Sequence, residues 1–396
     1  MNTAEIVEKN SKYVMNSYGR IPVAFEKGEG TKIWDADGNE YLDFVAGIAV
    51  TNLGHGNKKV VEAIKAQAEK LIHTSNMYYI EPQVKLAEML VEGTHFAQAF
   101  FCNSGAEANE AAIKLARKYG KLHMNGNYEI VTMKKSFHGR TITTITATGQ
   151  EKYQKSFTPL TSGFSYAEYG NIEDLRSKIT DKTLAVMIEV IQGEGGVNVR
   201  PEEYWEDIKA LVKEKNILLI IDEVQTGVGR TGNMFGYELY GLQPDIISVA
   251  KGIGNGVPMG IMLAKKELCV FEPGDHASTF GGNFLATAAG IAVVEQVKNS
   301  EFLYGVRKKG EYFRAKLSLL KDKYSFVKDV RGKGLMIGVE VEPEMIKPIV
   351  DGMFAEKMLI GSAGGIALRF VPPLTVSEEE IDTMVEKLDK VMAKLA

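Results

Sequence analysis

The sequence predicts an α/β fold with a mostly parallel central sheet covered by helices, and a second, smaller α+β domain. Short apolar runs rich in branched side chains end abruptly in charged or glycine-rich segments, as at 217–221 before Asp222 and at 245–249 before Ala250-Lys251-Gly252. Runs of this length and composition are typical of strands that are buried on both faces. Helical patterns alternate with these runs through the middle of the chain, which favours a parallel sheet with helices on both sides.

Composition narrows the class of protein. The chain has 396 residues, of which 45% are hydrophobic and 25% charged, and these values are typical of a globular protein long enough for two domains. A net charge of −4 gives no reason to expect a nucleic acid or an anionic membrane as partner. No apolar run is long enough to span a bilayer, and the first residues lack the apolar core of a signal peptide. We therefore expect a cytoplasmic protein.

The cysteines and histidines do not suggest a metal site. Cys102 and Cys269 lie inside apolar segments without metal-ligand spacing, and the six histidines are scattered. We expect buried thiols, no disulfide and no bound metal.

Several elements can be placed from local signals. Residues 32–44 contain an Asp-Gly turn between alternating runs and predict a hairpin. Asn57 is expected to cap a helix, Pro82 to open another and Pro201 a third. The apolar faces of the first two helices are expected to be Val60, Val61, Ile64, Ala68 and Leu71, and Val84, Ala87, Leu90 and Val91. Further strands are expected at 99–102, 128–132, 184–190 and 259–264.

The composition changes near Leu285 to long amphipathic helices and short strands, two of them at 335–341 and 367–371. Ser377 and Glu380 form a capping box for the last helix. Its inward residues are expected to be Ile381, Met384, Val385, Leu388, Val391 and Leu395. We expect residues 1–56 to contribute to the small domain, 57–284 to form the large domain and 285–396 the rest of the small one.

Asp222 and Lys251 are the first candidate site residues. Each follows a predicted parallel strand, and ligand sites of open α/β sheets lie beyond the carboxyl ends of such strands. The simplest interpretation is a buried ion pair. The alternative is a site for pyridoxal phosphate, in which a desolvated lysine reacts with the cofactor aldehyde and an aspartate keeps the pyridine nitrogen protonated.

Three loops that follow other strands carry further candidates. The Ser104-Gly105-Ala106 turn lies at a helix N-terminus, which can bind an anion, although most such turns are only caps. Phe137 offers a flat ring for stacking, and Arg140 a fork for a carboxylate, unless they are a packed Phe and a surface Arg. Glu194 lies on a glycine-rich loop, and we expect His138 to be structural.

The central stretch resembles a known family. Residues 220–232, Ile-Ile-Asp-Glu-Val-Gln-Thr-Gly-Val-Gly-Arg-Thr-Gly, with Ala250-Lys251-Gly252 after them, are similar to the signature of class III aminotransferases, which have the fold type I of PLP-dependent transferases. The resemblance extends from about Tyr18 to Thr375. It implies a bound pyridoxal 5'-phosphate and a ping-pong exchange of an amino group.

The resemblance also implies a role for each candidate. Lys251 would hold the cofactor and move a proton, while Asp222 would stabilise the protonated pyridine ring. The remaining cofactor contacts would be Ser104, Gly105 and Ala106 at the phosphate, Phe137 and Val224 on the two ring faces, Gln225 near the phenolic oxygen, and Thr279 from the other subunit of a homodimer.

Within the family, the pattern at 44–50 and at Leu53-Gly54-His55 is most similar to N-acetylornithine aminotransferases. Ile48 stands where ornithine aminotransferases typically carry a tyrosine, and an apolar residue suits an acylated amine. The subgroup implies transfer of the terminal amine of N2-acetylornithine to 2-oxoglutarate, giving glutamate and N-acetylglutamate 5-semialdehyde for arginine biosynthesis. Arg140 would bind a substrate carboxylate, Glu194 and Arg369 would form a reversible pair, and Tyr18 and Ser278 would be further substrate contacts.

Two segments depart from the subgroup pattern, Gly56-Asn57-Lys58 and residues 364–367. Both lie toward the substrate side, so ornithine, succinylornithine, N-succinyldiaminopimelate and 4-aminobutyrate stay open as donors. A non-catalytic regulatory module is the alternative of another class. The presence of Lys251 together with Asp222, Arg140, Glu194 and Arg369 argues against it, because a binding module needs no proton-shuttling lysine.

Overall fold

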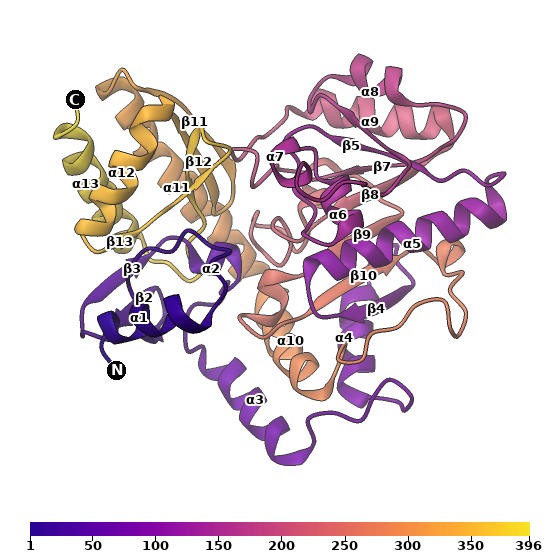
Figure 1. Ribbon diagram of the computed structural model, residues 1–396, viewed down its shortest axis with the longest axis horizontal. Coiled ribbons are helices and arrows are strands. Elements are labelled where there is room, and N and C mark those ends of the chain that lie inside the picture. Colours follow the sequence, from indigo (N-terminus) through magenta and orange to yellow (C-terminus); the bar gives the residue numbers. More distant parts are fainter.

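The computed structural model describes residues 1–396 as two lobes (Figure 1). The large lobe contains a seven-stranded sheet in the order β4-β10-β9-β8-β7-β5-β6. The small lobe contains two four-stranded sheets, β1-β2-β3-β13 and β11-β12-β15-β14. Strand β13 pairs in parallel with β3, so the N-terminal and C-terminal segments share the small lobe.

The strands of the large sheet are β4 (Gln98–Cys102), β5 (Glu129–Met133), β6 (Phe164–Ala167), β7 (Thr183–Ile188), β8 (Leu218–Asp222), β9 (Ile246–Val249) and β10 (Gly260–Ala264). Those of the small lobe are β1 (Phe25–Glu29), β2 (Lys32–Asp35), β3 (Glu40–Asp43), β11 (Val327–Lys333), β12 (Met336–Val341), β13 (Met358–Leu359), β14 (Gly361–Ala363) and β15 (Ala367–Phe370).

The α-helices are α1 (Thr3–Tyr13), α2 (Ala46–Ala49), α3 (Lys58–Lys70), α4 (Glu81–Val91), α5 (Gly105–His123), α6 (Ile142–Ala147), α7 (Glu151–Gln154), α8 (Ile172–Lys178), α9 (Glu202–Lys215), α10 (Phe284–Val297), α11 (Ser300–Lys323), α12 (Pro343–Ala355) and α13 (Glu378–Ala393). Short 3-10 helices cover Gly236–Tyr240, Lys251–Gly254 and Lys266–Leu268.

The large sheet is mostly parallel, as predicted. Strands β9, β8, β7, β5 and β6 pair in parallel, and β10 pairs antiparallel with both β9 and β4. Strand β4 therefore runs in the common direction again, beyond β10. The carboxyl ends of β4, β5, β7, β8 and β9 meet at one edge of the sheet, where an open α/β sheet binds its ligand.

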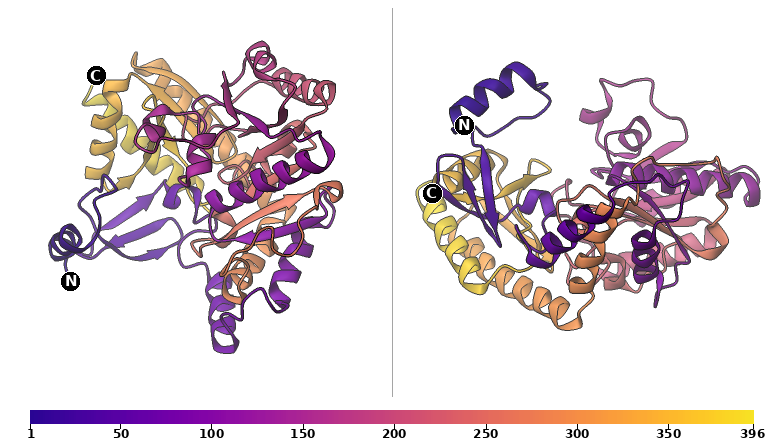
Figure 2. Two further views of the ribbon diagram at one scale, coloured as in Figure 1. Left: turned by 45° about the vertical axis from the view of Figure 1, so that its right-hand side comes forward. Right: turned by 90° about the horizontal axis from the view of Figure 1, so that it is seen from below.

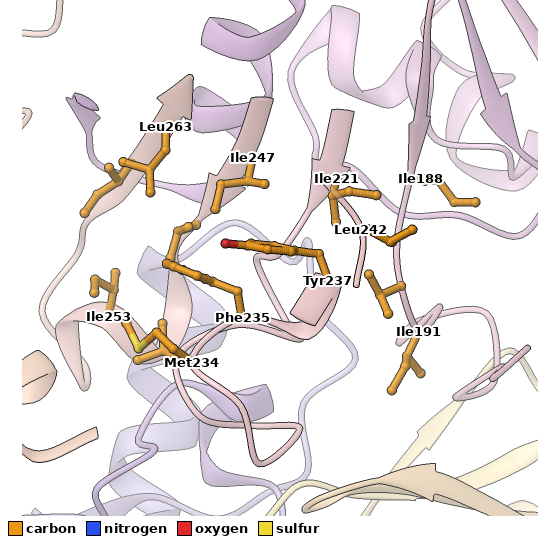
Figure 3. Close-up of a cluster of buried hydrophobic side chains, with 14 of the residues drawn as sticks. Ile188, Ile191, Ile221, Met234, Phe235, Tyr237, Leu242, Ile247, Ile253 and Leu263 are labelled. Atoms are coloured by element: carbon orange, nitrogen blue, oxygen red, sulfur yellow. The ribbon is translucent and has the colours of Figure 1, made fainter. Parts of the chain in front are cut away.

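Alternate residues of the strands serve two separate cores. In β8, Leu219 and Ile221 belong to a large cluster with helices α4, α9 and α10, whereas Leu218 and Ile220 pack with α5 on the other face. Figure 3 shows part of the first cluster, in which the strand residues meet Phe235 and Tyr237. Burial on both faces explains why these strands read as continuous apolar runs.

Helix α10 packs with the large lobe although the composition changes near its start. Its apolar residues join the large cluster, and it contacts α3 and α4. The separate small-lobe cluster is formed by α11 to α13 with β11, β12 and β15. This packing favours a division between lobes after Val297, and the domain limits of 56/57 and 284/285 stay a prediction.

The start signals of several helices act as predicted. The side chain of Asn57 accepts a hydrogen bond from the Val60 N–H, and Ser377 and Glu380 form the expected capping box. The predicted hairpin is the β2–β3 pair. The strands that were missed are short or polar and lack a distinctive apolar run: β1, β6, β11, β13 and β14.

Some predicted inward faces were wrong. Val84 is 59% exposed while Leu86 is buried, Ala68 and Leu71 face outward on α3, and Leu395 lies beyond the end of α13. In α3 and α4 the reason is that no other part of the same chain covers these faces. Helix α1, at the outer end of the small lobe (Figure 2), likewise buries none of its residues.

A buried arginine joins the two lobes. Arg230 has no carboxylate partner, and it donates hydrogen bonds to the Leu335 and Pro372 carbonyl oxygens at 2.9 and 2.5 Å and to Asn52 Oδ1 at 2.6 Å. Burial lowers its pKa to about 9. Because Pro372 closely follows Arg369, this junction also fixes the strand that carries a candidate site residue.

We expect opposite effects from the same substitution at two helix glycines. A Cβ at Gly120 in α5 would lie 2.2 Å from the Asn127 carbonyl oxygen, whereas one at Gly305 in α11 would meet no atom within 4 Å. Gly120→Ala should lower the free energy of unfolding by about 1–3 kcal/mol through overpacking. Gly305→Ala should raise it by about 0.5–1 kcal/mol through helix propensity. Urea unfolding of both variants checks this, and equal effects would contradict the packing around α5.

Candidate active site

A cavity of about 390 Å³ lies at the edge where the parallel strands end. Its walls come from the segments that follow five different strands, so residues far apart in sequence meet there. The polar residues that line it include Asn103, Ser104, Asn109, His138, Arg140, Glu189, Glu194, Asp222, Gln225 and Lys251.

Asp222 is buried at the end of β8 and all its hydrogen bonds are internal. Oδ2 accepts from Asn109 Nδ2 at 2.8 Å and lies 2.8 Å from His138 Nδ1, while Oδ1 accepts from the Val224 N–H at 2.9 Å. The carboxylate is thus held in one orientation at the cavity wall. The interpretation of Asp222 and Lys251 as a simple ion pair is wrong, since no salt bridge or hydrogen bond joins them.

Lys251 follows β9 in a left-handed backbone conformation, with φ of 47°. Its ammonium makes no hydrogen bond to the protein and is partly open to the cavity. Burial lowers the pKa of Lys251 to about 8, because the desolvation cost outweighs the attraction of Glu194, Asp222 and Glu189. A minor fraction of the lysine is therefore unprotonated at neutral pH and a large share at mildly alkaline pH, and this is the state that a nucleophilic amine needs.

The N-terminus of α5 presents unused donors to the cavity. The Ser104 side chain caps the helix by accepting from the Glu107 N–H at 3.2 Å, and the N–H groups of Gly105 and Ala106 have no protein acceptor. Glycine is needed at 105 because a Cβ there would lie 2.7 Å from Val224 Cγ1. This turn can bind an anion such as a phosphate.

Val224 and Gln225 lie on a loop fixed by a second buried acid, Glu223. Its carboxylate accepts from Thr226 Oγ1 at 2.5 Å and from the Gly236 and Tyr237 N–H groups at 2.8 and 2.7 Å. Burial raises the pKa of Glu223 to about 7 in spite of these bonds. The carboxylate shapes the loop without reaching the cavity.

Glu194 and Arg369 form the predicted pair. The guanidinium of Arg369, buried on β15, is hydrogen-bonded to Glu194, and Gln225 contacts both residues at 3.2 and 3.3 Å. Burial raises the pKa of Glu194, but the charges of Arg369 and Lys251 outweigh it and the pKa lies below its usual value. Glu194 thus stays ionised beside Lys251.

Arg140 lies at the cavity without a carboxylate partner or any hydrogen bond to the protein. Its Cζ atom lies 4.0 Å from the centre of the Tyr153 ring and 5.5 Å from that of Phe137. Its donors are therefore available to an anion from solution.

The structure places three candidates away from the cavity lining. Tyr18 and Thr279 are exposed on the surface, and neither reaches the cavity within this chain. Ser278 lies one step away, since its Oγ accepts from Asn103 Nδ2 at 3.1 Å. The roles of Tyr18, Ser278 and Thr279 stay predictions.

Four residues were missed or given no role by sequence reasoning. His138 was expected to be structural, but it contacts Asp222, and Asn109 and Tyr153 contact site residues from helices. Glu189 is buried in the cavity wall, 3.4 Å from the Phe137 N–H. Burial and the charge of Asp222 raise the pKa of Glu189 well above its usual value. Glu189 directly follows a buried strand, as Asp222 ends one, and that signal could have identified it.

The chain is similar to known proteins over nearly its whole length. The family model for "Aminotransferase class-III" matches residues 13–392, so the chain belongs to the class III aminotransferase family. The chain is 53% identical to the acetylornithine aminotransferase of Caldanaerobacter subterraneus subsp. tengcongensis, over 98% of this chain and 100% of the relative. It is 49% identical to that of Methanocaldococcus jannaschii, over the full length of both.

Solved structures give the same result. The ornithine aminotransferase from Toxoplasma gondii ME49 superposes with a TM-score of 0.95 at 31% identity, over 100% of this chain and 96% of the other. The acetylornithine aminotransferase from Elizabethkingia anophelis has a TM-score of 0.88 at 30% identity, over the full length of both. Another structure of the Toxoplasma gondii enzyme, which covers 99% of this chain and 94% of that one with a TM-score of 0.95 at 31% identity, contains PLP at partial occupancy in its active site.

The lowered pKa of Lys251 has a consequence for stability. Below about pH 8 Lys251 is charged in both the folded and the unfolded protein, and its desolvation in the folded protein lowers the free energy of unfolding. Between about pH 8 and 10.5 Lys251 is neutral in the folded protein, so this loss of stability disappears as the pH rises. Cofactor-free Lys251→Met should be more stable than the wild type at pH 7, by about 1–3 kcal/mol after allowance for partial exposure. The difference should shrink at pH 10. Urea unfolding of both proteins at the two pH values checks this, and a pH-independent difference would refute the desolvation argument.

Proposed function

We propose that this protein uses pyridoxal 5'-phosphate to transfer the terminal amine of N2-acetylornithine to 2-oxoglutarate, giving N-acetylglutamate 5-semialdehyde and glutamate. The observation that carries the proposal is the arrangement of charges around Lys251: Arg140 is free, whereas Arg369 is paired with Glu194. Arg140 can bind a substrate carboxylate at once, whereas Arg369 can do so only after it has separated from Glu194. The names of the acetylornithine aminotransferases at 53% and 49% identity support the same donor.

The residues of the cavity fit the cofactor. The free N–H groups at the start of α5 suit its phosphate, Phe137 and Val224 offer apolar surfaces for its ring, and Asp222 is a fixed acceptor for a protonated ring nitrogen. When bound, pyridoxal phosphate supplies an aldehyde that reacts with amines and a ring that withdraws electrons from the substrate carbon.

The chain's own groups would then do three tasks. Lys251 Nζ would hold the cofactor through its amine, and as a free amine it would accept the proton of the substrate carbon and donate it again. Asp222, oriented by His138 and Asn109, keeps the ring nitrogen protonated. The lowered pKa of Lys251 suits it to accept a proton near neutral pH.

The Glu194–Arg369 pair would let one pocket serve two substrates. The donor brings one carboxylate, which Arg140 can bind bidentately while Arg369 stays neutralised by Glu194. The acceptor brings two carboxylates, and the second can replace Glu194 on Arg369. A charged Arg369 without any partner would be costly at this buried position.

The donor's acyl group would lie near the segment after β3. The short element α2 is not a right-handed helix: Ala46, Gly47, Ile48 and Ala49 have φ of 49°, 63°, 65° and 59°. The following Val50 lines the cavity. Asp43 supports this turn by accepting from the Val45 and Ala46 N–H groups at 2.8 and 2.9 Å. Such a run costs conformational energy. Ile48 is 41% exposed and does not line the cavity of the single chain, so its contact with the acyl group rests on the resemblance and on the poor fit of an apolar side chain to a free ammonium.

The partner would be a second copy of the chain, with Thr279 acting across the interface. The 278–282 loop packs against the segment that includes His73, Asn76 and Gln83. His73 packs on Phe280, Asn76 Nδ2 donates to the Ser278 and Gly281 carbonyl oxygens at 3.0 and 2.9 Å, and Gln83 Nε2 donates to the Gly282 carbonyl oxygen. Exposed apolar side chains lie in the same region. The exposed residues of this region include Leu71, Ile72, Met77, Tyr78, Tyr79, Val84 and Phe280. An uncovered patch of this kind marks an interface.

Two further findings bear on the location of the enzyme. None of the helices combines the length and the apolar character needed to cross a bilayer, and Cys102 and Cys269 are free thiols. We place the enzyme in the cytoplasm, where thiols remain reduced.

The choice of donor is tested directly. Purified enzyme with 2-oxoglutarate should turn over N2-acetylornithine with a kcat/KM at least tenfold above that for free ornithine, because the apolar surroundings of the acyl group disfavour an ammonium by more than about 1.4 kcal/mol. Cofactor absorbance after mixing with each donor alone gives the half-reaction rates. Faster reaction of ornithine, succinylornithine, N-succinyldiaminopimelate or 4-aminobutyrate would replace the proposed donor.

Arg369 should matter for the acceptor and not for the donor. Arg369→Gln should raise the KM for 2-oxoglutarate by roughly ten- to a hundredfold through loss of a charge-assisted bidentate contact. The half-reaction with N2-acetylornithine should change less than threefold. Arg176→Gln, which breaks an exposed Arg–Glu pair on the surface, is the control and should leave both unchanged. Equal losses with both substrates would contradict the exchange of partners.

A further inference from the structure

We propose that Tyr153 is a positioning residue for the substrate carboxylate: its ring is a shelf that holds the Arg140 guanidinium in place. The inference rests on the proposed role of Arg140 and names a residue that this role requires. Arg140 Cζ lies 4.0 Å from the Tyr153 ring centre, within cation–π distance.

Polar contacts do not fix the Arg140 head group, and of its two ring contacts the one with Tyr153 is the shorter. Arg140 is exposed, it makes no hydrogen bond and no carboxylate lies within 4 Å of it, so polar contacts do not choose among its rotamers. An unrestrained arginine loses considerable conformational entropy when a ligand orders it. Stacking on Tyr153 orders the side chain before the substrate arrives.

The shelf itself is rigid, although α7 is only one turn long. On one side of Tyr153, Gln150 Nε2 donates to the Ser136 carbonyl oxygen at 2.9 Å. On the other, Gln154 Nε2 donates to the Thr148 carbonyl oxygen at 2.7 Å and lies 3.0 Å from Tyr166 Oη. These two amides anchor the turn to the loop that carries Phe137 and Arg140 and to the C-terminal end of α6, the helix that follows this loop.

The rings of Tyr153 and Phe137 form a corner. Their centres are 5.8 Å apart and their planes are inclined by 83°, and the guanidinium lies within 5.5 Å of the Phe137 centre as well. Phe137 is the proposed stacking ring of the cofactor, so Tyr153 links the position of the carboxylate-binding group to that of the cofactor.

Stacking on a ring is compatible with substrate binding, whereas an ion pair would compete with it. The donors of a guanidinium lie in its plane, and a ring against its face leaves them free for a bidentate carboxylate. A nearby acid would hold Arg140 equally well but would have to be displaced, as we propose for Glu194 at Arg369. Tyr153 therefore orients Arg140 without masking it.

The test compares Tyr153→Leu with Tyr153→Phe in the complete enzyme. Tyr153→Leu should raise the KM for N2-acetylornithine, and for glutamate in the reverse half-reaction, by roughly three- to tenfold, the range expected for a cation–π contact at a partly exposed site. The limiting rate and the pH dependence of the cofactor absorbance should stay unchanged. Tyr153→Phe keeps the ring face and should keep the wild-type KM. Tyr304→Leu, at an exposed tyrosine 5.8 Å from Arg307 and away from the cavity, is the matched control.

Each outcome decides a separate point. A wild-type KM in Tyr153→Leu, or a loss in Tyr153→Phe equal to that in Tyr153→Leu, would overturn the shelf. A loss confined to the limiting rate would also overturn it, since that indicates general damage to the site. If the wild type does not react with N2-acetylornithine, the proposed donor is wrong, and the KM values for glutamate still decide the role of Tyr153.

Discussion

The site depends on the parallel pairing of β8 with β9. In this register Asp222 lies opposite Ser248, three residues before Lys251, so an acid and an amine leave neighbouring strands at the same edge. Parallel strands β7 and β5 bring Glu189 and the Phe137–Arg140 loop to that edge, and β4 adds the N-terminus of α5. Crossover connections make this possible, because each returns the chain to the starting edge and lets every strand end at the cavity.

Charge in the cavity is balanced by burial and by specific partners. Glu194, Asp222 and Glu189 are the cavity's acidic residues and Lys251 and Arg140 its basic ones, and Arg369, outside the lining, pairs with Glu194. Asp222 is held by three hydrogen-bond donors, and Glu194 is neutralised by Arg369. The pKa of Glu189 is raised and that of Lys251 is lowered. Groups of like charge with pKa values pushed in different directions are characteristic of catalytic sites.

Residues that end buried strands could be predicted from the sequence, because an apolar run that stops at a charge is visible in one dimension. Asp222, Lys251 and the α5 turn are of this kind, and the long signature at 220–232 supplied the family. His138, Asn109 and Tyr153 could not be predicted in the same way. Their contacts join segments 84, 113 and 13 residues apart, and they depend on side-chain direction within a loop or a helix. The wrong faces of α3 and α4 have another cause: their exposed apolar residues have the same spacing as those of a core-facing helix, so the sequence pattern does not distinguish the two.

The acid-free guanidinium of Arg230 limits how this enzyme can change shape. From the large lobe, this buried side chain donates hydrogen bonds to Asn52 in the N-terminal loop and to Leu335 and Pro372 in the small lobe, and all three acceptors are neutral oxygens. If the lobes moved apart, the buried Arg230 guanidinium would lose all three of its hydrogen-bond acceptors. This would cost far more free energy than the rotation of a single carboxylate side chain that is open to solvent. The proposed alternation between substrates of different charge would then rely on individual side chains, with the two lobes kept in one arrangement.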